Sequence, residues 1–180
     1  MEFRKNASVK KNQKGFTLVE LGIVVGLVLL LLSGLAGASR VISGTKVNDE
    51  VSELRSIVSN VQKIYAGASV YTGATLTDII ALKGLPDARV TSATTAANRF
   101  GGALTFTVST LSSTDDSLKM SSAATPEYEC LNIIPQVDSV FSKIMIGTNI
   151  VKPVGGTVSK TVLATGCTGG NKTIDYYFGK

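Results

Sequence analysis

The sequence predicts an α+β fold, in which one long N-terminal helix leads into a small head domain that also contains β-strands. Two observations support this prediction. An apolar run at residues 16–38 continues into a segment with helical periodicity, and short segments rich in β-branched and aromatic residues follow. With 180 residues in total, the chain has room for one head domain beyond this helix.

The first 15 residues form a basic leader. They contain five basic residues and one acidic residue, which leaves 13 basic and 12 acidic residues in the rest of the chain. The net charge of +5 therefore belongs mainly to the leader, and the remainder is close to neutral. The sequence gives no specific indication of a nucleic-acid partner.

Residues 16–38 form an apolar run of 23 residues in which Glu20 is the single charge. As a helix this run is about 34 Å long, enough to cross a hydrocarbon core of about 30 Å. Because the basic leader precedes the run, the positive-inside rule places residues 1–15 in the cytoplasm and the head domain outside. We therefore expect a transmembrane segment at 16–38.

The helical pattern continues beyond this segment. Apolar residues recur at steps of four and three at Val47, Val51, Leu54, Val58, Val61, Tyr65 and Ala68. The opposite face carries Asp49, Glu50, Glu53, Arg55 and Lys63, so we expect it to face solvent. The sequence thus predicts one helix over residues 16–68, whose second half lies on the head domain.

The head domain, residues 69–180, contains shorter elements. A short helix is expected at Thr77–Leu82, before Gly84 and Pro86, and a surface loop at 91–97. Helical segments separated by Pro135 are expected at Pro126–Asn132 and Gln136–Lys143. Strands are expected at Leu104–Val108, Ile144–Ile146, Asn149–Val151, Val158–Leu163 and Thr173–Phe178.

The composition argues against an enzyme. The chain has no histidine, which removes the commonest general base and zinc ligand. It also lacks a glycine-rich phosphate loop, and the acidic pairs Asp115-Asp116 and Glu127/Glu129 lie in polar stretches typical of a solvated surface. We therefore expect no catalytic residues, no metal site and no cofactor.

The two cysteines, Cys130 and Cys167, lie in the part of the chain placed outside the membrane, where thiols are oxidised. We expect them to form a disulfide, and the alternative is two separate buried thiols. On the chain-entropy model the closed loop would contribute about 3 to 4 kcal/mol of stability.

The segment Lys14-Gly15-Phe16-Thr17-Leu18-Val19-Glu20 resembles the cleavage and methylation signature of type IV prepilins, and the apolar run resembles their N-terminal helix. The resemblance implies a pilin fold, with the long helix packed on an antiparallel β-sheet. It also implies cleavage after Gly15 by a prepilin peptidase that then N-methylates Phe16. Glu20 would be the acidic residue required for methylation and assembly.

The chemistry of Glu20 agrees with this resemblance. A carboxylate inside a membrane helix is costly, so it needs a compensating role. After cleavage Phe16 carries a free, positively charged amine, with which the Glu20 carboxylate of a neighbouring subunit can pair. Such a pair would fix the stagger between subunits, while the apolar faces supply most of the cohesion.

The second half of the helix and the positions of the cysteines resemble the type IVb branch of the family. The resemblance implies a major structural subunit of an extracellular filament used for adhesion, aggregation or conjugation. Its partners would be copies of itself, the prepilin peptidase/N-methyltransferase, and the pilus assembly machinery of the bacterial inner membrane. The precursor would reside in that membrane before it enters the pilus.

Two alternatives remain open. A minor pilin or a type II secretion pseudopilin would share the same N-terminus. Ala36-Gly37-Ala38 also satisfies the signal-peptidase rule, and cleavage there would release a periplasmic binding protein that starts at Ser39. The N-terminal residue of the mature protein distinguishes cleavage after Ala38 from cleavage after Gly15.

Overall fold

The structure is a computed structural model that describes residues 17–180, with the side chains of residues 31–43 excepted. The predicted leader at 1–15, with Gly15, and the predicted new terminus Phe16 lie outside the described residues. The chain divides into two compact units, Met1–Val41 and Ile42–Lys180. We refer to the second unit as the head.

Helix α1 spans Leu18–Ile64, and its last 23 residues belong to the head. The predicted apolar face is confirmed for Val47, Val51, Leu54, Val58 and Val61, which are at most 5% exposed. The predicted end at Ala68 is wrong. Beyond Ile64 the chain tightens into a turn, in which the Ala66 N–H donates to the Lys63 carbonyl.

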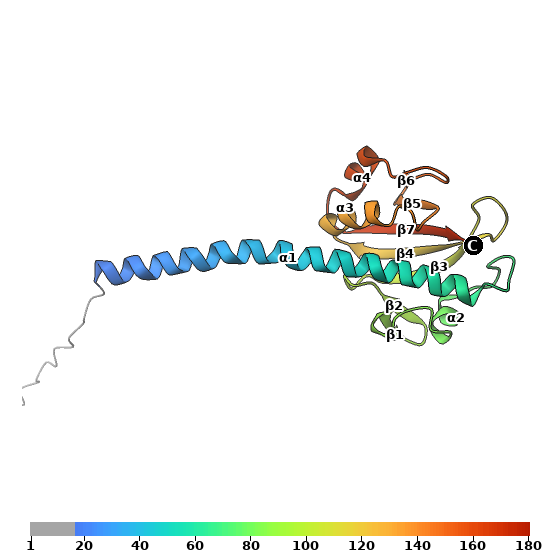
Figure 1. Cartoon of the computed structure of the whole chain (residues 1–180), viewed down its shortest axis with the longest axis horizontal. Coiled ribbons are helices and arrows are strands. Elements are labelled where there is room, and N and C mark those ends of the chain that lie inside the picture. Colours follow the sequence, from blue (N-terminus) through green and yellow to red (C-terminus); the bar gives the residue numbers. More distant parts are fainter. Residues whose placement is uncertain (1–16) are drawn as a thin grey trace, which may run out of the picture. The chain divides into compact units, whose positions relative to one another are not determined.

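The head contains one antiparallel sheet of seven strands in the order β1-β2-β3-β4-β7-β5-β6 (Figure 1). The strands are β1 (Val90–Ser92), β2 (Thr95–Ala97), β3 (Ala103–Ser109), β4 (Ser117–Thr125), β5 (Lys143–Ile146), β6 (Asn149–Lys152) and β7 (Lys172–Gly179). The last strand, β7, lies between β4 and β5 at the centre of the sheet.

One face of this sheet forms the core with α1. Its inward side chains are almost completely buried: Leu104, Phe106, Leu118, Met120, Ile144, Ile146, Ile174, Tyr176 and Phe178. They belong to the same apolar cluster as the buried face of α1. The predicted fold class, a long helix packed on an antiparallel sheet, is therefore confirmed.

Four of the five predicted strands form, as β3, β5, β6 and β7. Val158–Leu163 is not a strand, because α4 (Lys160–Cys167) begins within it. Leu163, Gly166 and Cys167 are its buried residues, at the helical spacing of three and four. The prediction relied on the β-branched residues of this segment. The segment forms a helix that packs only one side on the head, through Leu163, Gly166 and Cys167.

Three strands escaped prediction. The expected loop at 91–97 is a hairpin of β1 and β2, and β4 consists largely of serine and alanine outside Leu118 and Met120. The short helix α2 (Leu76–Ala81) forms as expected, and the 3-10 turn η1 (Asp87–Arg89) follows it.

Helix α3 spans Glu127–Gln136 and includes Pro135 in its last turn. The second predicted helix, Gln136–Lys143, does not form, because the Val137 N–H closes α3 by donating to the Ile133 and Ile134 carbonyls. Helices α3 and α4 lie beside each other near β5, β6 and β7 (Figure 1).

Candidate functional site

The start of α1 is a capping box built from Thr17 and Glu20. The Glu20 carboxylate accepts hydrogen bonds from the Thr17 N–H and from the Thr17 hydroxyl, both at 3.0 Å. In return, the Glu20 N–H donates to the Thr17 hydroxyl oxygen at 3.3 Å. This reciprocal pair satisfies donors that a helix start leaves open. Glu20 therefore has a local partner within the subunit, in addition to any partner on a neighbouring one.

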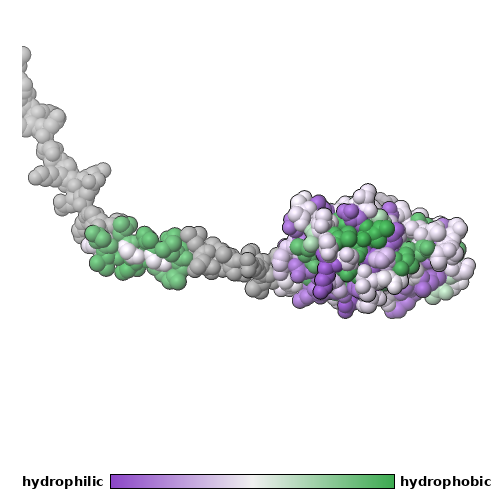
Figure 2. Space-filling model, turned by 90° about the horizontal axis from the view of Figure 1, so that it is seen from above, coloured by the Kyte–Doolittle hydropathy of each residue, from purple (hydrophilic) through white to green (hydrophobic). Residues whose placement is uncertain are grey.

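Behind this box, the side chains of α1 between residues 21 and 30 are apolar and exposed (Figure 2). Ten large apolar side chains between residues 18 and 30 are at least 47% exposed, and Leu18 reaches 88%. Gly22 and Gly26 leave open space around the helix, since a Cβ there would meet nothing within 4 Å. An exposed apolar surface of this extent is typical of a site that is covered by a partner or by lipid.

Within the described side chains, no helix has both the length and the apolar character to cross a membrane. Of the predicted span 16–38, residue 16 and the side chains of residues 31–38 lie outside that part of the chain.

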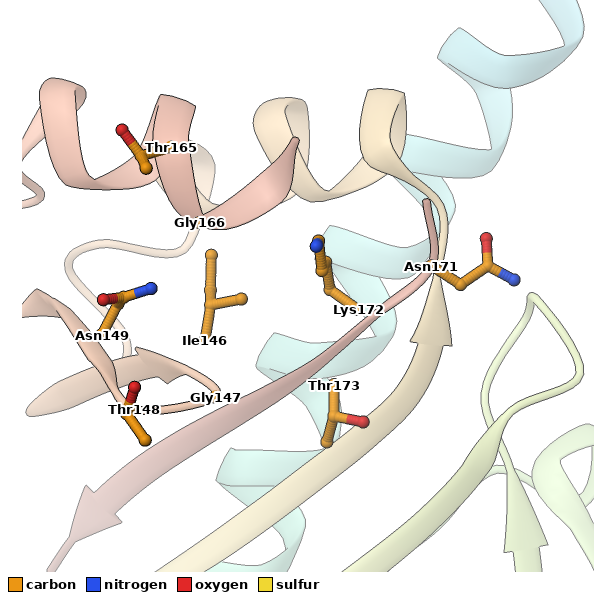
Figure 3. Close-up of a pocket in the computed structure, with 9 residues that line it drawn as sticks. All are labelled: Ile146, Gly147, Thr148, Asn149, Thr165, Gly166, Asn171, Lys172 and Thr173. Atoms are coloured by element: carbon orange, nitrogen blue, oxygen red, sulfur yellow. The ribbon is translucent and has the colours of Figure 1, made fainter. Parts of the chain in front are cut away.

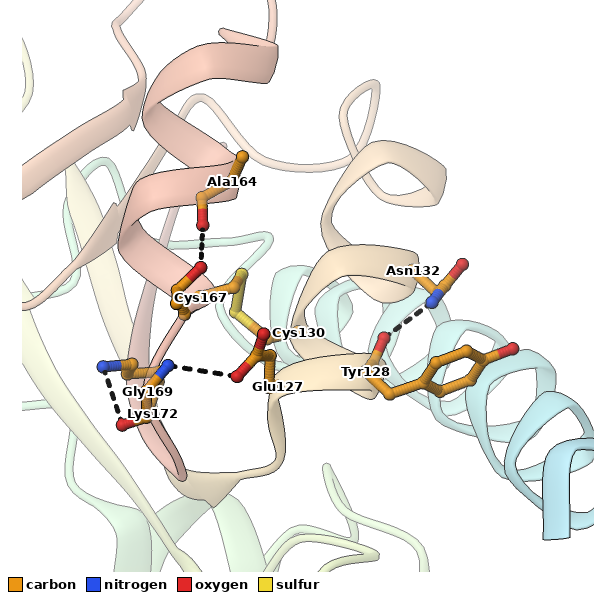
Figure 4. Close-up of a disulfide and its surroundings, with 9 residues drawn as sticks. Glu127, Tyr128, Cys130, Asn132, Ala164, Cys167, Gly169 and Lys172 are labelled. Carbon is orange, nitrogen blue, oxygen red and sulfur yellow. Dashed lines mark hydrogen bonds between the residues drawn. A yellow bond between two sulfur atoms is a disulfide. The ribbon is translucent and has the colours of Figure 1, made fainter. Parts of the chain in front are cut away.

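The second feature is the disulfide between Cys130 on α3 and Cys167 at the end of α4 (Figure 4). The structure contains the expected bond, with a Cα–Cα distance of 5.7 Å, and both cysteines are completely buried. Near it, the Glu127 carboxylate accepts from the Gly169 N–H at 3.0 Å, and Lys172 donates to the Gly169 carbonyl at 3.3 Å. The bond thereby holds α3 and α4 together near the start of β7.

A third feature, which sequence reasoning missed, is a charged cluster between α1 and the segment that crosses from α2 to β3. Arg89 donates through Nε to a Glu53 carboxylate oxygen at 2.6 Å, and its Nη2 lies 4.0 Å from Glu50. Arg99 pairs with the other Glu53 oxygen and, at 3.2 Å, with Asp49. We call these five residues the arginine clamp, because two arginines fasten the crossing segment to α1.

The clamp corrects one prediction. Glu50 was expected on the solvent face of the helix, yet it is only 4% exposed, because it lies three residues after Val47 and four before Leu54, on the buried side of α1. Burial raises the pKa of the Glu50 carboxyl above its ordinary value of 4.5, and the Arg89 guanidinium opposes this shift. One oxygen of Glu50 and the Nε of Arg99 are buried without a hydrogen-bond partner, so these two groups carry a desolvation cost within the clamp.

The head also has a polar hollow of about 430 Å³ between the β5–β6 hairpin, α4 and the start of β7 (Figure 3). Its nine lining residues are Ile146, Gly147, Thr148, Asn149, Thr165, Gly166, Asn171, Lys172 and Thr173. Lys172 is the one charged side chain among them, and no carboxylate lines the hollow. This lining offers neither a general acid and base nor a nucleophile with a base beside it.

Comparison with protein families gives two matches. The family described as PilS N terminal matches residues 45–177, and the prokaryotic N-terminal methylation motif matches residues 10–36. The second match contains Gly15, Phe16 and Glu20, and the first contains both cysteines and the clamp. A search of curated protein sequences gives no match.

Three solved structures resemble this one. The type IVb pilin from Salmonella typhi, in its crystal structure, has a TM-score of 0.58 at 16% identity, over 73% of this chain and 99% of that one. TcpA, a type IV pilin from Vibrio cholerae El Tor biotype, has a TM-score of 0.56 at 13% identity, over 74% of this chain and 99% of that one. The NMR structure of the type IVb pilin PilS from Salmonella typhi has a TM-score of 0.53 at 18% identity, over 74% of this chain and 96% of that one. These similarities show a shared fold.

Proposed function

Because the chain belongs to the PilS family of type IV pilins, whose model matches residues 45–177, we propose that it is the precursor of a major, type IVb-like filament subunit. Pilins of this family are structural subunits and not enzymes. The precursor is held in the bacterial inner membrane by residues 16–38 and loses its leader after Gly15. The subunit that starts at Phe16 then enters an extracellular filament for adhesion, aggregation or conjugation.

The observation that carries this proposal is the exposed apolar surface of residues 18–30 directly behind Glu20. Large apolar side chains in water cost free energy until another apolar surface covers them. Lipid supplies that cover before assembly, and the helices of neighbouring subunits supply it in the filament. The open space around Gly22 and Gly26 would let two helices approach closely.

The capping box gives the Glu20 carboxylate a partner before assembly, and the filament would give it a second one. In the single subunit, Thr17 donates two hydrogen bonds to the Glu20 carboxylate and so compensates part of its charge. In the filament, the free amine of Phe16 from a neighbouring subunit becomes the second partner of the same carboxylate. Because a carboxylate accepts several hydrogen bonds, Thr17 can keep its contact while the new pair forms.

The membrane-embedded peptidase and the assembly machinery are the other partners in this scheme. Glycine at position 15 leaves the backbone unobstructed for a narrow protease groove, whereas a glutamate there would bring both bulk and charge. Gly15→Glu should therefore leave the leader attached and the precursor in the inner membrane.

The test is the intact mass of filaments sheared from the source cells, measured for the wild type and for Gly15→Glu. Wild-type filaments should consist of a chain that begins at Phe16 and is heavier by one methyl group. The Gly15→Glu cells should show no filaments and a full-length precursor in the membrane fraction. A mature chain that begins at Ser39 would contradict the proposal and favour a secreted periplasmic protein. A correctly processed chain found only as a trace component of filaments would favour a minor pilin.

A further inference from the structure

The outer face of the head sheet, opposite α1, carries two lysines on either side of a tyrosine. In the register of the sheet, Lys119 on β4 lies directly opposite Tyr177 on β7, and Lys143 on β5 lies opposite the same tyrosine on its other side. Their neighbours in the sequence, Leu118, Ile144, Tyr176 and Phe178, are buried, so the alternation of the strands turns these three outward. We call Lys119, Tyr177 and Lys143 the lysine row.

Two of the three side chains of the row, Lys143 and Tyr177, have contacts that hold them in place. The Lys143 ammonium lies 4.8 Å from the centre of the Tyr177 ring, and the Tyr177 hydroxyl donates to the Met145 sulfur at 3.6 Å. The two lysines stand about 10 Å apart at the backbone, because neighbouring strands are about 4.8 Å apart. Within residues 17–180 no carboxylate lies within ion-pair distance of either ammonium.

The surroundings of the row are rich in hydroxyl groups. Thr107 on β3 lies opposite Lys119, and Thr105 lies opposite Ser121. Asp175, the acidic residue nearest in register, lies on the same outward face two residues before Tyr177 and accepts a hydrogen bond from Ser121 at 2.5 Å. None of the outward side chains on β3 is buried. The face therefore combines two lysines that have no ion-pair partner, and one nearby carboxylate, with groups that both donate and accept hydrogen bonds.

We propose that the lysine row binds an acidic polysaccharide that carries a carboxylate or sulfate on alternating sugars. The two ammoniums supply charge complementarity to successive acidic groups, and the threonine and serine hydroxyls match the hydroxyls of the sugars between them. Duplex DNA also repeats its charges, but its internal deoxyribose sugars carry no free hydroxyl to pair with the threonine and serine side chains beside the row.

This proposal rests on the proposed function, because the two ion pairs that one subunit can form with a polysaccharide would hold it only weakly. A filament repeats the row in every subunit, and a polysaccharide repeats its acidic groups along its length. Once one row is occupied, the neighbouring rows meet the same chain at high effective concentration. Filaments should therefore retain a polymer that single subunits release.

The test uses purified filaments of the wild type, of Lys119→Gln/Lys143→Gln, and of the control Lys83→Gln/Lys160→Gln. The control removes the same charge from two exposed lysines outside the row. Filament formation is checked first by electron microscopy. Binding is then measured to immobilised hyaluronan, chondroitin sulfate, neutral dextran and short duplex DNA, at low and at physiological salt.

Wild-type and control filaments should bind the two acidic polysaccharides, more weakly as salt rises, and should not bind dextran. The affinity of the Lys119→Gln/Lys143→Gln filaments for the two acidic polysaccharides should be lower by a factor of about ten or more. Equal binding by this variant, an equal loss in the control, or stronger retention on DNA would overturn the proposal. Failure of this variant alone to assemble would also overturn it and make the face a subunit contact. Absence of filaments in the wild type would instead contradict the proposed function.

Discussion

Helix α1 contains two stretches with similar apolar residues and opposite surroundings. Between residues 18 and 30 the large apolar side chains are exposed, whereas between residues 47 and 61 they are buried against the head sheet. The acidic residues differ in the same way. Glu20 is held by a neighbour three residues away, whereas Glu53 is held by arginines 36 and 46 residues away. The second stretch is covered within one chain, whereas the first is exposed and is, in our proposal, covered by lipid or by a neighbouring subunit.

The strongest test of this difference is the same leucine-to-alanine substitution in each stretch. Leu54 is 1% exposed and Leu27 is 56% exposed. Leu54→Ala should lower the free energy of unfolding of the head by about 3 kcal/mol or more, because it leaves a cavity in a packed core. Leu27→Ala should leave that free energy unchanged and reduce the yield of filaments. Denaturant unfolding, followed by a signal from the head, together with sheared filament yield, separates the two effects. Equal losses of head stability in Leu54→Ala and Leu27→Ala would contradict the division of α1 into a buried and an exposed stretch.

Removal of the disulfide should have the next largest effect, and again only on the head. The double variant Cys130→Ser/Cys167→Ser should lose about 3 kcal/mol, because the bond closes a loop with a sequence separation of 37 residues. Processing after Gly15 should continue, since the leader does not depend on the head. Non-reducing peptide mapping of the wild type provides the check on the bond itself. Two alkylatable thiols in native, unreduced protein would contradict it.

The arginine clamp should contribute somewhat less. Arg89→Met would leave the carboxylates of Glu50 and Glu53 with less compensation, and we expect a loss of about 2 kcal/mol, since Glu53 remains partly exposed. The matched control is Lys83→Met, which breaks an exposed pair with Asp87 and should change stability by about 0.5 kcal/mol at most. Similar losses in the two variants would show that the clamp is no stronger than an ordinary surface pair.

The smallest effect concerns pH. Because the pKa of Glu50 is raised in the folded head, the folded state holds this proton at pH values where the unfolded state has released it. The wild type should therefore lose stability relative to Glu50→Gln as the pH rises above 4.5, the ordinary value of this group, until the folded carboxyl has also ionised. Urea unfolding of both proteins at several pH values measures the difference. A difference that stays constant, or that favours the wild type at higher pH, would contradict the burial argument.

Local patterns allowed the sequence to predict α1, its buried face and four strands, because periodicity and β-branched residues are read within a few positions. The capping box at Thr17 and Glu20 is also local and could have been read from Thr-Leu-Val-Glu. By contrast, β4 has few apolar residues to mark it. The clamp joins residues 36 or more positions apart, so no local pattern indicates its pairs. The burial of Glu50 is different, because this residue lies three positions after Val47 and four before Leu54, at the spacing of the apolar face.

The proposed role of Glu20 is to act between subunits, whereas the arginine clamp acts within one chain. Its most direct test is the amount of filament shed by cells that carry Glu20→Val, compared with Asp87→Asn, which removes an exposed carboxylate of the head. Glu20→Val cells should still cleave after Gly15 and form the Cys130–Cys167 bond. They should accumulate the subunit in the inner membrane without filaments, while Asp87→Asn cells shed normal amounts. Wild-type quantities of filament from Glu20→Val cells would contradict the intersubunit role of this carboxylate.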